Sequence, residues 1–258
     1  MSDILLSAFF LSLVLLGINS YFGLEIIRRG IIFTDLAIGQ MAALGAAMSL
    51  FFWEGAYLYP VSLAFALLGG LIIALASRRS ANLEAFIGLM YAFSFAGVYI
   101  LLSKSYHGME EFQKLMAADI LFTPIEAIIQ TAILYAVLGV LIALIHYRAK
   151  NGFLRDILFF VTFAITVTSA VRLAGVLVLF ALLVAPALIA TLIGRGIPLI
   201  NAWIIGIGLN ILAIVVSYHF DFPTGYTVVF INALAALLVS LGCCLRKRST
   251  PLPEEPTA

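Results

Sequence analysis

Two polar residues, Asp35 and Gln40, lie in the stretch RRGIIFTDLAIGQMAALG (residues 28–45), which is otherwise almost all apolar beyond its arginine pair. A polar or ionisable side chain inside a membrane helix costs free energy, so it indicates a functional pathway by default. Other interpretations stay open. Asp35, six residues past Arg29, could cap the start of a helix or interact with its dipole. Gln40 could form an interhelical hydrogen bond.

A second polar group follows much later in the chain. His107, Glu110, Glu111 and Asp119 occur together between two apolar runs. An imidazole suits zinc and carboxylates suit manganese, so this group could bind a divalent metal ion. The alternative is an ordinary hydrated loop, because the spacing is not that of a closed structural metal site.

Glu84 follows the basic pair Arg78 and Arg79 and opens another apolar run. It could be their ion partner at the membrane interface, or a carboxylate of the pathway. Pro186 interrupts a later apolar run. It indicates either a hinge in the wall of a pathway or a purely structural kink.

The elements that carry these residues must be membrane helices. Of the 258 residues, 64% are hydrophobic and 10% are charged, and the mean hydropathy is +1.17. Soluble domains carry about 25% charged residues. The apolar runs are continuous and do not alternate with a period of two, which argues against a β-barrel. A net charge of +1 gives no basic patch for nucleic acid. We therefore predict an all-α polytopic helical bundle.

The apolar runs predict eight to nine spans, each near the roughly 20 residues that cross a bilayer. Their expected positions are about 5–24, 35–53, 57–77, 85–103, 125–146, 154–171, 174–193, 199–218 and 224–245. Residues 1–245 would form one transmembrane domain, and the proline-rich polar tail 246–258 is expected to be disordered.

The basic residues predict the orientation of the chain in the membrane. If successive spans alternate direction, the pairs at 28–29 and 78–79, the segment 146–156, Arg195 and the run 246–248 all fall on one side. The positive-inside rule makes that side the cytoplasm. The prediction is a multi-pass protein of the cell (inner or plasma) membrane, with its N-terminus outside and its C-terminus in the cytoplasm.

Several stretches, in order, resemble the membrane permeases of bacterial zinc, manganese and iron ABC importers. RRGIIFTDLAIGQMAALG resembles the arginine pair and polar second-span motif of that family, and EAFIGLMYAFSFAGVYILL and HGMEEFQKLMAADIL resemble two further segments. VRLAGVLVLFALLVAPALIA and FDFPTGYTVV resemble its most specific signatures. The resemblance covers most of the chain and implies a type II ABC importer permease fold.

The resemblance also implies a function and a set of partners. A homodimer of permeases would work with two ATPase subunits and a periplasmic or surface metal-binding protein, and the divalent metal would be cargo. Asp35 would be a ligand in the pathway, and Gln40 stands where a histidine is typical of the family. Glu84 would support them, and His107 and Glu110 would lie at the outer mouth.

The chain departs from the family at the loop that docks the ATPase. In the family this loop carries an acid, an alanine and a terminal glycine; here only Arg148, Lys150, Asn151 and Gly152 stand in that place. We expect these residues to contact an ATPase. The chain contains no G-x-x-x-x-G-K-[ST] phosphate loop, so ATP would be hydrolysed on the partner chains and this chain is not expected to be an enzyme.

Two functions of other classes remain alternatives. The chain could be an ion-coupled secondary transporter, although repeated halves with broken helices are not evident. It could also be a membrane scaffold or sensor that has kept the fold and lost the ligands, because of Gln40 and the short loop.

Overall fold

The computed structural model describes residues 2–77, 82–105, 107–118, 120–148 and 152–248. Over these residues the regular structure is entirely helical, as the sequence predicts. The elements in chain order are α1 (Ser2–Arg29), α2 (Thr34–Trp53), α3 (Leu58–Ala76), α4 (Leu83–Leu102), α5 (Gly108–Met116), the 3-10 helix η1 (Ile120–Phe122), α6 (Ile125–Arg148), α7 (Gly152–Ala174), α8 (Val176–Ile193), α9 (Pro198–Phe220) and α10 (Thr224–Arg248).

Nine helices in the described part of the chain, all but α5 and η1, are long and apolar enough to cross a membrane. The nine predicted spans are thus confirmed, within a few residues at most ends. The largest difference is at the end of α1, which continues to Arg29 rather than stopping near residue 24. Glu25 accepts hydrogen bonds from Arg28 and Arg29 one turn later, and such pairs stabilise a helix through charged residues.

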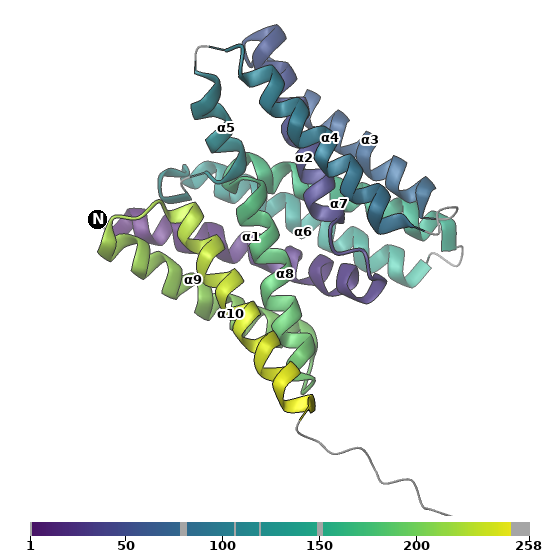
Figure 1. Ribbon diagram of the computed structural model, residues 1–258, viewed down its shortest axis with the longest axis vertical. Helices are drawn as coiled ribbons and strands as arrows, with labels where there is room; N and C mark the ends of the chain where they lie inside the picture. The colour runs from purple at the N-terminus through teal and green to yellow at the C-terminus, as the bar shows by residue number, and fades with distance from the viewer. Residues whose placement is uncertain (1, 78–81, 106, 119, 149–151, 249–258) are drawn as a thin grey trace, which may run out of the picture.

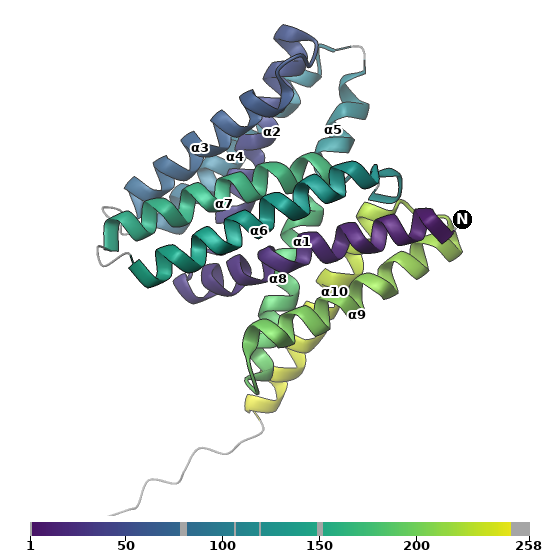
Figure 2. The same cartoon turned by 180° about the vertical axis from the view of Figure 1, so that it is seen from behind.

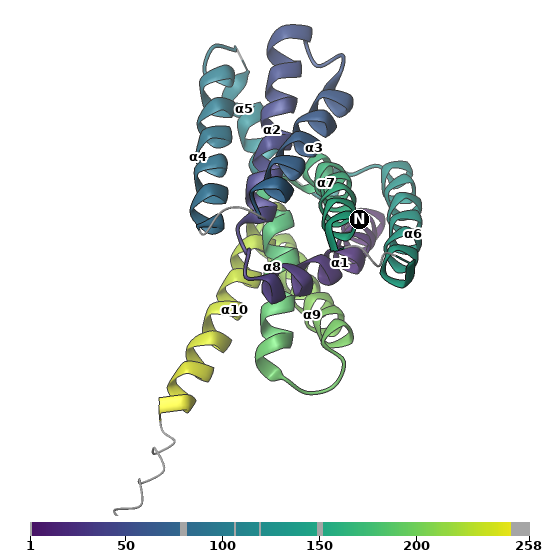
Figure 3. The same ribbon diagram turned by 90° about the vertical axis from the view of Figure 1, so that its right-hand side faces the viewer.

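The helices form two packed groups that share a centre. Helices α2, α3 and α4 pack together at the top of Figure 1, and α3 also contacts α7; α8, α9 and α10 pack together in the lower part and with α1. From behind, α6, α7 and α1 cross the middle of the molecule (Figure 2). The short helix α5 lies beside α4 (Figure 3).

Small residues bring these helices close together. A Cβ on Gly23 of α1 would stand 2.0 Å from the carbonyl oxygen of Leu183 in α8. One on Gly45 of α2 would stand 2.7 Å from the carbonyl oxygen of Val61 in α3. Backbone approach of this kind is how helices pack where lipid removes the hydrophobic drive for association.

Gly175 alone separates α7 from α8, and its φ of +87° favours glycine. Next to it, the backbone N–H of Ala118 donates to the carbonyl oxygen of Ala174 at 2.9 Å. A Cβ on Gly175 would meet the carbonyl of Met116 at 2.7 Å, and one on Gly225 would meet that of Ala118 at 2.4 Å. We call residues 116–118, Gly175 and Gly225 the central crossing. By contrast, α8 continues through Pro186, which does not end the helix.

Candidate functional site

The first residue of the site is Asp35, in the first turn of α2. Its side chain is only 1% exposed. The residue that precedes the helix is Phe33, which makes no side-chain cap, so Asp35 is not the N-cap. Its carboxylate lies near the backbone N–H groups of Asp35 and Leu36, but neither oxygen meets them in hydrogen-bond geometry. The dipole of α2 favours a negative charge at this end of the helix.

Gln40 lies further along α2 and is also 1% exposed. Its amide Nε2 donates to the thioether sulfur of Met116 at 3.4 Å. Thioether sulfur is a weak acceptor. The amide oxygen of Gln40 has no partner among the described residues. The predicted interhelical hydrogen bond is therefore present, between α2 and α5, but it uses only the nitrogen.

Buried oxygens without a hydrogen-bond partner among the described residues recur along α2. They are Oγ1 of Thr34, both carboxylate oxygens of Asp35, Oε1 of Gln40 and Oγ of Ser49. A buried polar atom without a hydrogen bond costs about 1–3 kcal/mol, and such atoms are rare in folded proteins. This helix therefore carries polar atoms available to a ligand that enters it.

Glu84 lies in the first turn of α4 and binds the connection between α1 and α2. Its Oε1 accepts a hydrogen bond from the backbone N–H of Ile32 at 2.9 Å, three residues before Asp35. Its Oε2 is buried and has no partner among the described residues. Arg78 and Arg79, its expected ion partners, lie outside the described residues.

His107 and Glu110 lie at the start of α5, where Nδ1 of His107 is 3.9 Å from Oε2 of Glu110. Lys114 forms ion pairs with both neighbouring carboxylates. Its Nζ lies 2.9 Å from Oε1 of Glu110 and 3.2 Å from Oε1 of Glu111. The hydrogen bond from Lys114 lowers the pKa of Glu110, so this carboxylate is ionised and already paired at neutral pH. Asp119 lies outside the described residues.

The predicted metal residues do not come together within the described part of one chain. Glu84 opens α4 and His107 follows its other end. A helix of 20 residues separates them, about 30 Å of rise. No group of three or more histidine, cysteine or acidic side chains placed to hold a metal occurs among the described residues. The metal role of Asp35, Gln40, Glu84, His107 and Glu110 stays a prediction.

A cavity of about 430 Å³ lies between α2, α3, α5 and α7. Its lining includes Tyr59, Lys114 and Arg172, with Ala46 and Val171 among the remaining wall. Val171 is also next to Gly39, since a Cβ on that glycine would stand 3.6 Å from a Val171 methyl carbon. The cavity therefore ends close to the part of α2 that holds Gln40.

Arg172 and Tyr59 were not predicted as candidate site residues. The guanidinium of Arg172 lies over the Tyr59 ring, 5.8 Å from its centroid, and both residues also line a second cavity of about 210 Å³. A signal was present. Arg172 is one of the few cations on the predicted outer side, against the bias that puts basic residues inside.

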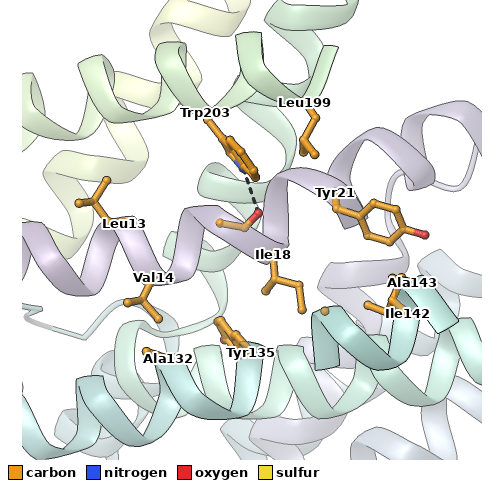
Figure 4. Close-up of a pocket in the computed structure, with 12 residues that line it drawn as sticks. Leu13, Val14, Ile18, Tyr21, Ala132, Tyr135, Ile142, Ala143, Leu199 and Trp203 are labelled. Atoms are coloured by element: carbon orange, nitrogen blue, oxygen red, sulfur yellow. Dashed lines mark hydrogen bonds between the residues drawn. The ribbon is translucent and has the colours of Figure 1, made fainter. Parts of the chain in front are cut away.

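The largest cavity, about 890 Å³, lies between α1, α6 and α9 and is mostly apolar. Trp203 closes one side, and its indole nitrogen donates to the carbonyl oxygen of Gly17 at 3.0 Å (Figure 4). Its lining includes two tyrosines but no carboxylate, and none of it comes from α2. This cavity is therefore separate from the Asp35–Gln40 region.

The expected ATPase-docking residues lie where α6 meets α7. Arg148 ends α6 and Gly152 begins α7, so three residues connect the helices. Lys150 and Asn151 are among those three, outside the described residues.

An ionic cluster joins α1 to the start of α7 near this connection. Arg29 bonds both Asp156 of α7 and Glu25 of α1, at 2.9 Å each. Its guanidinium also lies over the Phe159 ring, 4.3 Å from the centroid. The first turns of α7 are thus tied to the end of α1.

Comparison with known proteins supports the resemblance. Residues 150–243 match the ABC 3 transport family. An uncharacterized membrane protein in the ycf23-apcF intergenic region of Cyanophora paradoxa is 31% identical over 85 residues, which is 32% of this chain and 28% of that protein. The chain thus matches less than a third of the length of that relative.

Two solved structures share the fold. PsaBC from Streptococcus pneumoniae in complex with Fab gives a TM-score of 0.74 at 20% identity, over 92% of this chain and 90% of that one. A metal-chelate type ABC transporter in an inward-facing conformation gives 0.67 at 16% identity, over 91% of this chain and 85% of that one.

The fold and the family match define a class. The chain is a multi-pass membrane protein with the fold of ABC transporter permeases. Residues 150–243 match a transport family. The predicted resemblance to metal-type ABC permeases is confirmed.

Proposed function

We propose that this chain is the permease subunit of an ABC importer that moves a divalent metal, zinc, manganese or iron, by alternating access. The observation that carries the proposal is the set of buried, unpartnered oxygens on α2, which include Asp35 and Gln40. Oxygen donors suit hard and borderline divalent cations. One of the solved structures with this fold is a metal-chelate type ABC transporter, which supports cargo of this kind.

In this proposal the cargo enters from the outside through the cavity beside Arg172 and reaches Gln40 and Asp35 along α2. Glu84 positions the start of α2 through Ile32. Two copies of the chain, two ATPase subunits and an external metal-binding protein would complete the transporter. The N-terminus would lie outside and the C-terminus in the cytoplasm.

Uptake of radioactive zinc and manganese into proteoliposomes, with the co-purified ATPase, tests the proposal. We expect ATP-dependent uptake that falls in Asp35→Ala and Gln40→Ala. Ser94→Ala is the control, because Ser94 is buried on α4 and its hydroxyl already donates to the carbonyl oxygen of Met90. Unchanged uptake in both variants of an otherwise active complex would refute the pathway.

The three-residue connection between α6 and α7 favours one other function, a scaffold or sensor that does not couple to ATP hydrolysis. The two functions differ in whether an ATPase docks. A cysteine introduced by Asn151→Cys should cross-link to the co-expressed ATPase if the chain is a transporter. Absence of a cross-link, with no ATPase co-purifying, would favour the scaffold.

A further inference from the structure

Three hydrogen-bond donors without internal partners gather where the two cavities beside Arg172 meet. Tyr59 and Arg172 line both cavities, and Gln130 of α6 lines the smaller one. No hydrogen bond joins the Tyr59 hydroxyl, the Gln130 amide or the Arg172 guanidinium to another described residue, and no described carboxylate pairs with Arg172. Donors of this kind, set around a cavity, favour an oxyanion.

The carboxylates near the larger cavity pair with Lys114 and leave Arg172 without one. The lining of this cavity holds two cationic side chains, Arg172 and Lys114, and one carboxylate, Glu111. Glu111 is paired with Lys114 at 3.2 Å, and Lys114 is shared with Glu110. Arg172 is therefore the charge that lacks a partner, and a bare divalent cation beside it would be repelled.

The polar groups next to the Tyr59, Gln130 and Arg172 donors form hydrogen bonds with other residues. Ser62 donates to the carbonyl oxygen of Ala42 in α2, and Thr168 donates to that of Ala164 in its own helix. Ser169 is bonded to Thr166 and Tyr135. These hydroxyl groups are thus already used in hydrogen bonds within the protein, whereas the guanidinium of Arg172 remains available to a ligand.

We propose that this cavity binds an anionic chelate, a metal ion carried by a small polycarboxylate, and that this chelate is the form in which cargo enters. The cargo part rests on the proposed function; the binding part does not. A volume of about 430 Å³ is within the range of small-molecule sites, which are about 300–1,000 Å³. Val171 in its wall adjoins α2 beside Gln40, so the site lies directly before the proposed pathway.

Binding of citrate to the purified full-length chain, without its partners, tests the site. The probes are radioactive citrate alone, zinc citrate and free zinc, measured by equilibrium dialysis. We expect Arg172→Gln to weaken binding of citrate and of zinc citrate about tenfold or more, since it removes a charge-assisted, bidentate contact. Arg172→Lys should recover part of the loss, and Tyr59→Phe should cost about threefold. Binding of free zinc should not change.

Arg28→Gln is the control, because Arg28 is an exposed arginine paired with Glu25 on another part of the surface. It should leave citrate binding unchanged. The site is refuted if the wild-type chain does not bind citrate at millimolar concentration, or if Arg172→Gln binds it as tightly as the wild type does.

A lipid headgroup offers the same oxyanion chemistry, so nanodiscs of phosphatidylcholine and of phosphatidylglycerol separate the two sources. Equal citrate binding in both supports a chelate site. Loss of citrate binding in phosphatidylglycerol would assign the site to lipid and overturn the proposal. If citrate binding requires Arg172 but Asp35→Ala leaves metal uptake unchanged, the site stands and the proposed pathway fails.

Discussion

Helices α2 and α8 are buried to a similar degree, and their side chains differ in kind. In their most apolar windows, 67% of α2 and 61% of α8 are buried. The buried residues of α8 are all apolar, whereas those of α2 include Thr34, Asp35, Gln40 and Ser49. A helix that is buried to this degree can therefore have only apolar buried residues. The polar residues of α2 need a cause other than burial.

Buried polar residues elsewhere in the molecule mostly find partners. Asn232 of α10 donates to Asn210 of α9 at 3.2 Å and also to the carbonyl oxygen of Val228, although Oδ1 of Asn232 and Nδ2 of Asn210 have no partner among the described residues. Such pairs hold membrane helices together. The oxygens of Asp35 and Gln40 hold no helix in this way, which is why the comparison with α8 favours a ligand over a packing role.

The substitution Asp35→Asn is the most severe test of whether α2 is polar because it binds a ligand. If the carboxylate binds cargo, uptake should fall about 100-fold, the upper range for loss of a metal-site partner. Thermal stability in detergent should stay the same or rise, because a buried carboxylate without a partner is removed. If stability and uptake fall together, Asp35 has a packing role, like the buried apolar residues of α8.

Leu179→Ala makes the complementary change in α8. Leu179 is 1% exposed. Its truncation should lower the free energy of unfolding by about 2 kcal/mol, chiefly through the cavity it leaves. Reversible denaturation in mixed micelles measures this. The metal concentration for half-maximal uptake should not change, and a large shift in that concentration would place α8 in the pathway.

Gln40→His introduces the side chain typical of the family at this position. Imidazole is a strong zinc ligand, so zinc affinity should rise about tenfold relative to manganese, as measured by competition uptake. Gln40→Leu, which keeps the volume and removes the donor atoms, should not show this preference. Unchanged selectivity in Gln40→His would mean that cargo does not contact residue 40.

The smallest effect concerns the ionic cluster that joins α1 to the start of α7. Arg29 and Asp156 are partly exposed, with 24% and 34% of their side chains accessible. A double-mutant cycle with Arg29→Ala and Asp156→Ala should give a coupling of about 0.5 kcal/mol in unfolding, as for other accessible ion pairs. If the two substitutions show no coupling in stability but a large one in ATPase stimulation, this ion pair takes part in transmitting the energy of ATP hydrolysis.

The spans were predictable from sequence because each depends on its own composition, and all nine are present in the described chain. The site was only partly predictable. Asp35 and Gln40 stood out as polar residues in an apolar run, but the contact of Gln40 with Met116 joins residues 76 positions apart. Asp35 lies in the first turn of its helix, as one reading of the sequence allows, but its complete burial depends on how the other helices pack around α2.

Arg172 shows why the rest could not be predicted. In sequence it is one arginine at the end of an apolar run, and only folding brings Tyr59 beneath it and two cavities around it. Lys114, by contrast, pairs with glutamates three and four residues before it in its own helix, a contact that sequence spacing can indicate.

The central crossing has no room for further side chains. At Gly175 and Gly225, backbone rests on backbone with no side chain between them that could change rotamer. A methyl group at either glycine would therefore press against the segment 116–118. The Met116 sulfur that Gln40 contacts is thus positioned by two glycines far from it in the chain.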